Sequence, residues 1–294
     1  MEGTAVQKAR TATKKRSQLS MIWHQLLKNK LAICGLIIIG SMILASILIG
    51  FVVDYDTIIV HDIANRYQAP SAAHWFGTDG FGRDLFLRLV YGARISLFIG
   101  IVSVLGGMVA GGAIGSISGF YGGKIDMIVM RFMDVLMAIP STLMAICVVS
   151  ALGQGVTNLL LAIMISLIPQ FAMIVRSSVL TIKGSEFIEA ARCGGTSTAR
   201  IIIRHILPNA MGPIIVQATL ALGGVILTAA SLSFIGLGVQ PPEPEWGAIL
   251  TEGQSRMQDF PHVVLFPGLT IMLAVLACNF LGDGLRDALD PKLK

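Results

Sequence analysis

The sequence predicts an all-α membrane protein with six transmembrane helices. Hydrophobic residues make up 54% of its 294 residues and charged residues only 13%, whereas a typical soluble domain is about 25% charged. The apolar residues gather in long uncharged runs, each near the ~20 residues that an α-helix needs to cross a bilayer. Composition and run length therefore indicate a chain that is solvated mainly by lipid.

The uncharged runs supply six spans in chain order. Residues 135–175 are too many for one helix, and Gly153-Gln154-Gly155 divides them into two spans joined by a tight turn. The spans are expected at residues 31–53, 95–123, two within 135–175, 214–238 and 263–282. The predicted organisation is a basic tail and amphipathic surface helix (1–30), a first span (31–53), an outer segment (54–94), a five-helix core (95–282) and a tail (283–294).

The basic residues orient these spans. All but five of the 22 lysines and arginines fall on the side of the N-terminus, and cytoplasmic loops are enriched in these residues. Both termini are therefore predicted to lie in the cytosol, and the net charge of +5 needs no nucleic-acid partner. Residues 1–16 are expected near anionic lipid headgroups, and apolar residues at helical spacing predict an amphipathic helix at 17–30 on the inner membrane surface.

The second span carries glycines four residues apart. This spacing places them on one helix face, where another backbone can approach closely. The stripe therefore predicts helix packing, within this chain or with another, rather than a ligand site. Its members are Gly107, Gly111, Gly115 and Gly119.

The sequence lacks the residues that drive transport or catalysis. No lysine, arginine, aspartate or glutamate lies near the middle of a predicted span, although proton relays and ion-coupled carriers usually need such groups. There is no glycine-rich phosphate loop ending in Gly-Lys-Ser/Thr. The five histidines lie on both sides of the membrane and the four cysteines have no metal-binding spacing. We expect no catalytic residues, no metal site and no bound cofactor, so uphill transport needs an external energy source.

A charged stretch, EAARCGGTSTARIIIRHILPN, interrupts two apolar segments. Ser185 is a candidate cap for a short helix that Gly194-Gly195 ends. A second helix is expected from Ala199 to Leu207, with Pro208 helping to end it. Helices this short are marginal in water, so the unit must dock, either on lipid headgroups or on a protein.

This stretch resembles the EAA loop of bacterial ABC importer permeases. The resemblance rests on Glu189-Ala190-Ala191, Gly195 and the run from His205 to Pro208. It implies a type I ABC importer permease fold in which residues 184–208 form a coupling loop that inserts into a cytosolic ATPase. The family often has an aliphatic residue where His205 stands, but its peptide branch commonly has histidine. The implied coupling residues are Glu189, Ala190, Ala191, Arg192, Gly195, Arg200, His205, Leu207 and Pro208.

Two further segments, residues 75–97 and 231–250, resemble the second permease subunit of dipeptide, oligopeptide and nickel importers. The resemblance implies a bacterial inner-membrane complex with a second related permease, two ATPase subunits that bind ATP and Mg, and an extracytoplasmic solute-binding protein. A second permease also fits the absence of an internal repeat. Residues 243–262 would lie near the binding protein, although their acidic side chains could equally serve solvation. The candidate docking residues are Glu243, Glu245, Trp246, Glu252 and Asp259.

Other functions remain open on the sequence alone. The same machinery could import nickel or a metal chelate instead of peptides. A passive channel is a different class, but it would not need a capped docking unit. Finally, Asp84 and Arg88 stand at i,i+4 spacing in a predicted outer amphipathic helix at 83–94, where they are expected to pair.

Overall fold

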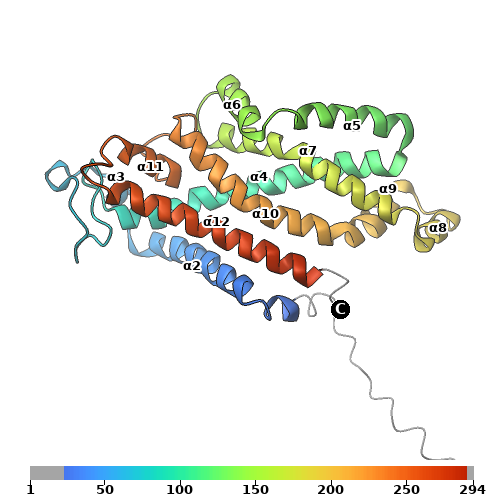
Figure 1. The fold of residues 1–294 in the computed structure, drawn as a ribbon, viewed down its shortest axis with the longest axis horizontal. Coiled ribbons are helices and arrows are strands. Elements are labelled where there is room, and N and C mark those ends of the chain that lie inside the picture. The colour runs from blue at the N-terminus through green and yellow to red at the C-terminus, as the bar shows by residue number, and fades with distance from the viewer. Residues whose placement is uncertain (1–22, 290–294) are drawn as a thin grey trace, which may run out of the picture.

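The computed structural model describes residues 23–289, which form an elongated bundle of helices (Figure 1). The predicted tail at 1–16, the first part (17–22) of the predicted surface helix at 17–30 and residues 290–294 lie outside the described residues. The elements are α2 (Lys30–Val52), α3 (Tyr55–Ile59), η1 (Ile63–Asn65), α4 (Leu85–Tyr121), α5 (Gly123–Met137), α6 (Ser141–Leu152), α7 (Val156–Ile182), α8 (Glu186–Cys193), α9 (Thr198–Arg200), the π-helix η2 (Ile201–Ile206), α10 (Leu207–Phe234), α11 (Trp246–Gln254) and α12 (His262–Leu289).

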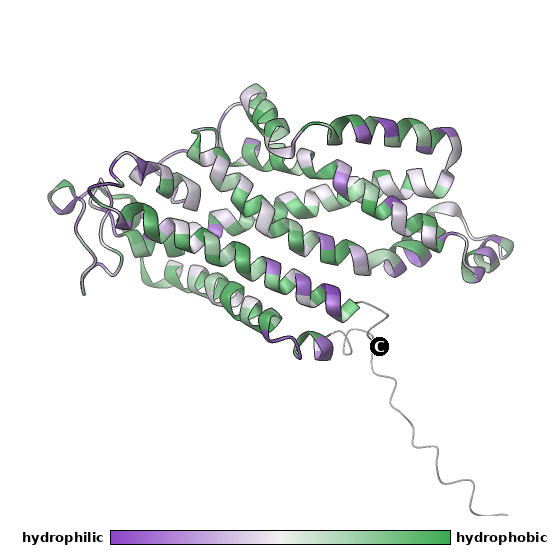
Figure 2. Cartoon of the chain, viewed as in Figure 1, coloured by the Kyte–Doolittle hydropathy of each residue, from purple (hydrophilic) through white to green (hydrophobic). Residues whose placement is uncertain are grey.

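The predicted all-α fold is confirmed for residues 23–289. Five helices in this range are long and apolar enough to cross a membrane, and the number is six if a bent pair counts as one span. Hydrophilic residues gather at the two ends of the bundle (Figure 2). One end carries α3 and α11, and the other carries α8 and the C-terminal end of α12 (Figure 1).

The third predicted span is bent instead of straight. α5 and α6 meet at an angle of 89° across a short break that ends at Pro140. Proline disfavours helical geometry in the residue before it, so the break falls where the sequence places this residue. The predicted turn after α6 is confirmed, because Gly153 and Gly155 have φ of +91° and +131°.

Two predicted helix boundaries are wrong. The expected outer helix at 83–94 is the beginning of α4, which continues without a break to Tyr121. Pro208 does not end the second helix of the charged stretch, because α9, η2 and α10 form one continuous run to Phe234. The π-helix shifts the hydrogen bonding before the proline, with Leu207 N–H bonded to Ile202 C=O. Pro208 then falls in the first turn of α10, where a missing N–H costs little.

The centre of the bundle is the close pair α4 and α7, and the glycine stripe lies between them. A Cβ at Gly107 would lie 2.8 Å from Leu167 Cβ, and one at Gly111 would lie 2.5 Å from the Ile168 carbonyl oxygen. Gly115 faces the Ala172 carbonyl and Gly119 faces Val179. The sequence predicted that the stripe packs helices either within this chain or with another chain. The structure shows packing within this chain, between α4 and α7.

α2 lies on the outside of the bundle against α12 and α4. Arg94 of α4 donates from Nε to the Ser46 carbonyl of α2 at 2.6 Å. Its guanidinium occupies the space that a side chain at Gly50 would fill. The Nε and Nη2 donors of the Arg94 guanidinium are thus paired with backbone carbonyls of the neighbouring helix α2.

Candidate functional site

The charged stretch forms a compact two-helix unit, residues 184–208, which we call the coupling unit. α8 ends in a turn with Gly195 at φ +73°. Gly195 N–H bonds to Arg192 C=O at 3.0 Å, and Thr196 N–H bonds to Ala191 C=O at 3.1 Å. These two bonds satisfy the last carbonyls of α8 and reverse the chain into α9. Ser185 precedes α8, but its hydroxyl donates to Ile182 C=O instead of capping the helix.

A small apolar core joins the coupling unit to the membrane helices. Ile188 of α8 and Ile201 and Ile206 of η2 are buried against Val175 and Val179 of α7. The unit also shares a contact with α4, because the guanidinium of Arg192 lies over the Phe120 ring at 5.1 Å. A force applied to α8 would therefore act directly on α4, α7 and α10.

The outer surface of the coupling unit mixes charged and apolar side chains. Of the predicted coupling residues, Ala191, His205 and Leu207 are half-buried. Phe187 and Ile203 add large apolar side chains that are 47% and 65% exposed. The exposed predicted residues are Glu189, Ala190, Arg192, Gly195, Arg200 and Pro208.

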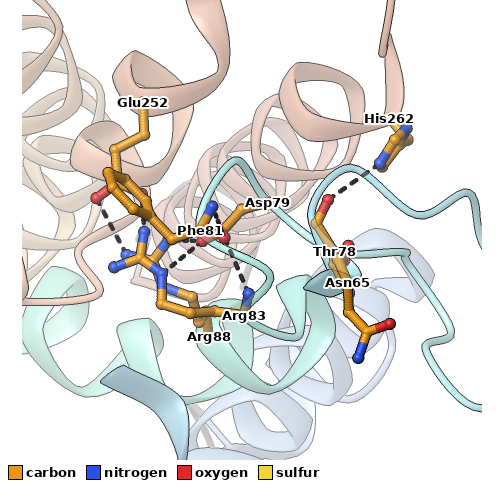
Figure 3. Close-up of polar contacts among 8 residues, drawn as sticks. All are labelled: Asn65, Thr78, Asp79, Phe81, Arg83, Arg88, Glu252 and His262. Carbon is orange, nitrogen blue, oxygen red and sulfur yellow. Dashed lines mark hydrogen bonds and ion pairs between the residues drawn. The ribbon is translucent and has the colours of Figure 1, made fainter. Parts of the chain in front are cut away.

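The opposite end of the bundle holds a buried charge cluster, formed by Asp79, Arg83, Arg88 and Glu252 (Figure 3). Arg83 Nε and Arg88 Nη1 donate to Asp79 Oδ2 at 2.7 and 2.6 Å. The same two arginines donate to Glu252 Oε2 at 2.5 and 2.6 Å. Arg88 is fully buried and Arg83 is 3% exposed. The cluster ties the loop before α4, α4 itself and α11 into one body.

Hydrogen bonds and a cation–π contact fix the rest of the outer loop. Thr78 donates to the Asn65 carbonyl at 2.5 Å and accepts from Gln68 N–H at 2.8 Å. His262, at the start of α12, lies with Nε2 3.3 Å from the Thr78 carbonyl oxygen (Figure 3). Arg83 also lies over the Phe81 ring, 4.6 Å from its centroid. The loop is therefore bonded to α12 as well as to α4 and α11.

Comparison with known families gives two matches, which together cover most of the chain. Residues 111–294 match the family described as binding-protein-dependent transport system inner membrane component. The chain belongs to this family of transport permeases. Residues 17–70 of the permease also match the N-terminal transmembrane domain of oligopeptide transport permease C.

Several curated relatives cover nearly the whole permease. It is 52% identical to the dipeptide transport system permease protein DppC of Alkalihalophilus pseudofirmus, over 92% of its own length and 89% of the relative's. It is 46% identical to the glutathione transport system permease protein GsiD of Pectobacterium atrosepticum, over 92% and 90% of the two chains. Its fold is similar to that of a chain in the inward-facing MetNI methionine ABC transporter, with a TM-score of 0.58 at 20% identity. That likeness covers 70% of the permease and 98% of the other chain.

The outer charge cluster corrects the predicted pairing of Asp84 with Arg88. Arg88 does not pair with Asp84, because its guanidinium turns inward to Asp79 and Glu252. Asp84 instead accepts from Leu87 N–H at the start of α4 and lies 2.8 Å from His74 Nδ1. The i,i+4 spacing predicted an exposed helix pair, but burial makes two nearby carboxylates from other segments the better partners for Arg88.

Two of the five predicted docking residues are buried in the permease. Glu245 is 1% exposed, where it accepts from Ala248 N–H at the start of α11 and from the Ser96 hydroxyl. Trp246 is also 1% exposed and donates from Nε1 to the Leu89 carbonyl. Glu252 belongs to the charge cluster. Glu245 and Trp246 therefore position α11 against α4, whereas Glu252 is half-buried and its two carboxylate oxygens accept from the arginines of the cluster.

Two predicted docking residues stay accessible. Asp259 is exposed and lies 3.6 Å from Arg256. Glu243 is half-buried near Tyr55. Burial raises the pKa of the Tyr55 hydroxyl, and the negative charge of Glu243 raises it further. As for metals, no three histidine, cysteine, aspartate or glutamate side chains between residues 23 and 289 are grouped to hold an ion.

Proposed function

We propose that this permease forms half of the translocation pathway of an ATP-driven importer of short peptides. Its curated relatives are named for the transport of a dipeptide and of glutathione, which is a tripeptide. Neither name includes a metal, so import of nickel or a chelate is the less favoured alternative. A passive channel does not fit a family whose description is binding-protein-dependent transport.

The proposed complex contains a second, related permease that supplies the other half of the pathway. Two cytosolic ATPase subunits bind ATP and Mg, and an extracytoplasmic binding protein delivers the peptide. The permease itself hydrolyses nothing and binds no cofactor. It lies in a bacterial inner membrane with both termini in the cytosol, as the distribution of lysine and arginine favours.

The observation that carries this proposal is the construction of the coupling unit. Its inner face is buried in an apolar core with α7 and α10, so it moves with the membrane helices. Its outer face exposes Glu189 and Arg192 beside the large apolar side chains Phe187 and Ile203. Such a mixed surface suits docking into a protein groove, because the apolar side chains leave water and the charges find partners at the rim. The ATPase is the proposed partner.

Reconstitution tests the proposal. The permease would be assembled in proteoliposomes with its partner permease, ATPases and binding protein, and uptake of labelled glycyl-leucine measured with and without ATP. We expect ATP-dependent uptake that Glu189→Lys abolishes while membrane insertion stays normal. Asp56→Lys, at an exposed site in α3 on the opposite end and outside the candidate docking residues, serves as the matched charge-reversal control and should retain uptake and ATPase binding. Uptake without ATP, or full ATPase coupling in Glu189→Lys, would refute the proposal.

A further inference from the structure

Two hollows flank α10 at the end of the bundle that carries the coupling unit. One, of about 420 Å³, lies between α7 and α10, and the other, of about 390 Å³, lies between α10 and α12. Both are lined by Ile174 and Pro213, so they meet across the same part of α10. Each volume falls within the range of about 300–1,000 Å³ that ligand pockets occupy.

The first hollow is lined with hydroxyl and amide groups, and two of its hydroxyls already donate within α7. Ser178 donates to Ile174 C=O at 3.0 Å, and Thr181 donates to Ser177 C=O at 3.0 Å. Asn209 donates from Nδ2 to His205 C=O at 2.6 Å. The hydroxyl lone pairs and the Asn209 amide oxygen remain, and these groups accept hydrogen bonds. The hollow therefore offers several acceptors to the N–H groups of a ligand.

Pro213 adds a further acceptor. It lies inside α10 and has no N–H, so the Asn209 carbonyl loses the helical donor that would come four residues later. A helix facing lipid cannot leave such a carbonyl unsatisfied without cost, whereas a helix that lines a water-filled cavity can. Hydroxyl, amide and carbonyl groups therefore lie together on one wall of a hollow that is otherwise mainly apolar.

The second hollow supplies the opposite chemistry. It is lined by Gln217 of α10 and Arg286 of α12, which bring amide and guanidinium donors. Arginine binds carboxylates through paired N–H groups. Gly212, which lines this hollow, leaves space next to α10 for a main chain.

We propose that the joined hollows form the inner half of the peptide pathway and bind the main chain of an extended short peptide. The acceptors on α7 and α10 take the peptide N–H groups, and Arg286 takes the terminal carboxylate. Recognition of the main chain suits a transporter that accepts varied side chains. This inference rests on the proposed function, because it assumes that peptides are the cargo.

Cysteine labelling tests the site in the assembled complex. In a background without native cysteines, Ser177→Cys lies in the first hollow, and Ile37→Cys lies at an exposed position of α2 that lines neither hollow. In inside-out vesicles, a water-soluble methanethiosulfonate should label Ser177→Cys at least about 10-fold faster. Glycyl-leucine should slow this labelling, and its C-terminal amide should protect more weakly. Equal labelling of the two cysteines, or no protection by glycyl-leucine, would overturn the proposal.

Substitutions of the lining residues test the ligand contacts. Arg286→Gln should raise the half-protecting concentration of glycyl-leucine about 10-fold or more and remove its advantage over the amide. Thr181→Val should raise that concentration about 2- to 10-fold. Arg131→Gln and Thr228→Val are controls outside the hollows, and they should leave protection unchanged. Unchanged protection in both Arg286→Gln and Thr181→Val would overturn the assignment.

The two proposals can fail separately. A wild-type complex that binds glycyl-leucine at the labelled site but shows no ATP-dependent uptake would refute the importer and keep the site. Normal uptake with no labelling of Ser177→Cys would keep the importer and refute the site.

Discussion

Gly195 has a conformation that other residues adopt at a cost. Its φ is +73°, and a Cβ built on it meets nothing within 4 Å. The penalty for a substitution is therefore backbone strain alone, on the order of 1–2 kcal/mol for most L-residues. A β-branched side chain is the least compatible with this conformation, and asparagine is among the most compatible.

We predict that Gly195→Val lowers ATP-dependent uptake several-fold by changing the angle between α8 and α9, while the membrane helices insert normally. Gly195→Asn fills the same open space with much less strain and should retain most of the uptake. Uptake and membrane abundance would be measured for both variants. Equal uptake by the two would show that the angle of this turn does not matter for coupling.

Arg88 is the second residue for which the structure predicts a large effect. Arg88→Met would leave Arg83 as the one basic partner that the described residues offer to the carboxylates of Asp79 and Glu252. Removing one member of a buried ion cluster typically costs about 3–5 kcal/mol. The purified variant should show a lower unfolding temperature and faster proteolysis of the loop before α4.

The exposed pair Arg256–Asp259 provides the control for this experiment. Asp259→Asn breaks an ion pair whose side chains are 59% and 63% exposed, and such pairs contribute about 0–1 kcal/mol. Its unfolding temperature should match that of the wild type. An Arg88→Met protein as stable as Asp259→Asn would mean that the charge cluster does not hold the outer loop.

The sequence could place these charges outside the spans but could not pair them. Arg88 and Asp84 stand at helical spacing, and that local rule predicted the wrong partner, since Glu252 comes from a segment 164 residues away. The sequence predicted that Glu245 and Trp246 lie on a docking surface, because they belong to an acidic outer segment. Both are instead buried against α4. Their burial depends on a tertiary contact that no local pattern contains. The end of α8 at Gly194-Gly195, in contrast, was predicted correctly because it is a property of one turn.

At the scale of elements, the close approach of α4 and α7 gives the clearest stability prediction. A Cβ at Gly115 would collide with the Ala172 carbonyl and lie 3.0 Å from Arg176 N. Gly115→Ala should therefore force the helices apart and lower stability by about 1–3 kcal/mol. Gly224→Ala is the control, because a Cβ there meets nothing within 4 Å.

The two glycine variants should differ in their unfolding temperatures. Helix propensity alone favours alanine over glycine by about 1 kcal/mol, so Gly224→Ala should be neutral or slightly stabilising. Gly115→Ala should unfold at a lower temperature despite the same gain in propensity. Two equal shifts would contradict the packing role of the stripe.

Element boundaries were predictable where glycine sets them and less so where proline does. Gly153 and Gly155 end and begin helices as expected. Pro140 ends the short break at which α5 and α6 meet at 89°, a bend that run length alone did not indicate. Pro208 was expected to end a helix, but a π-helical turn before it lets the helix continue. Proline removes a donor in each case, and the surrounding packing decides whether the helix breaks, bends or continues.

For the whole molecule, composition and run length were enough to predict the fold class, because lipid requires backbone groups to bond within helices. They could not define a pathway. The proposed inner hollows lie on the outside of a single chain, between α7, α10 and α12. In the proposed complex the second permease would close them, so a complete pathway requires a chain that this sequence does not contain.

The final prediction concerns the orientation of the whole bundle. Cys193 is exposed in the coupling unit, and Ala72 is exposed in the loop at the opposite end. The proposed topology places Cys193 in the cytosol and Ala72 outside. A variant that keeps only Cys193 should react with an impermeant maleimide after permeabilisation and not in intact cells. Ala72→Cys in a cysteine-free background should react in intact cells.

Both cysteine variants must retain uptake, so that the labelled proteins are correctly assembled. Membrane abundance and labelling of a denatured sample would confirm that each cysteine is present and reactive. The reverse labelling pattern would place the coupling unit outside, away from ATP. In that case Glu189, Arg192 and the exposed apolar side chains beside them could not receive the motion of a cytosolic ATPase, and the proposed coupling mechanism would fail together with the topology.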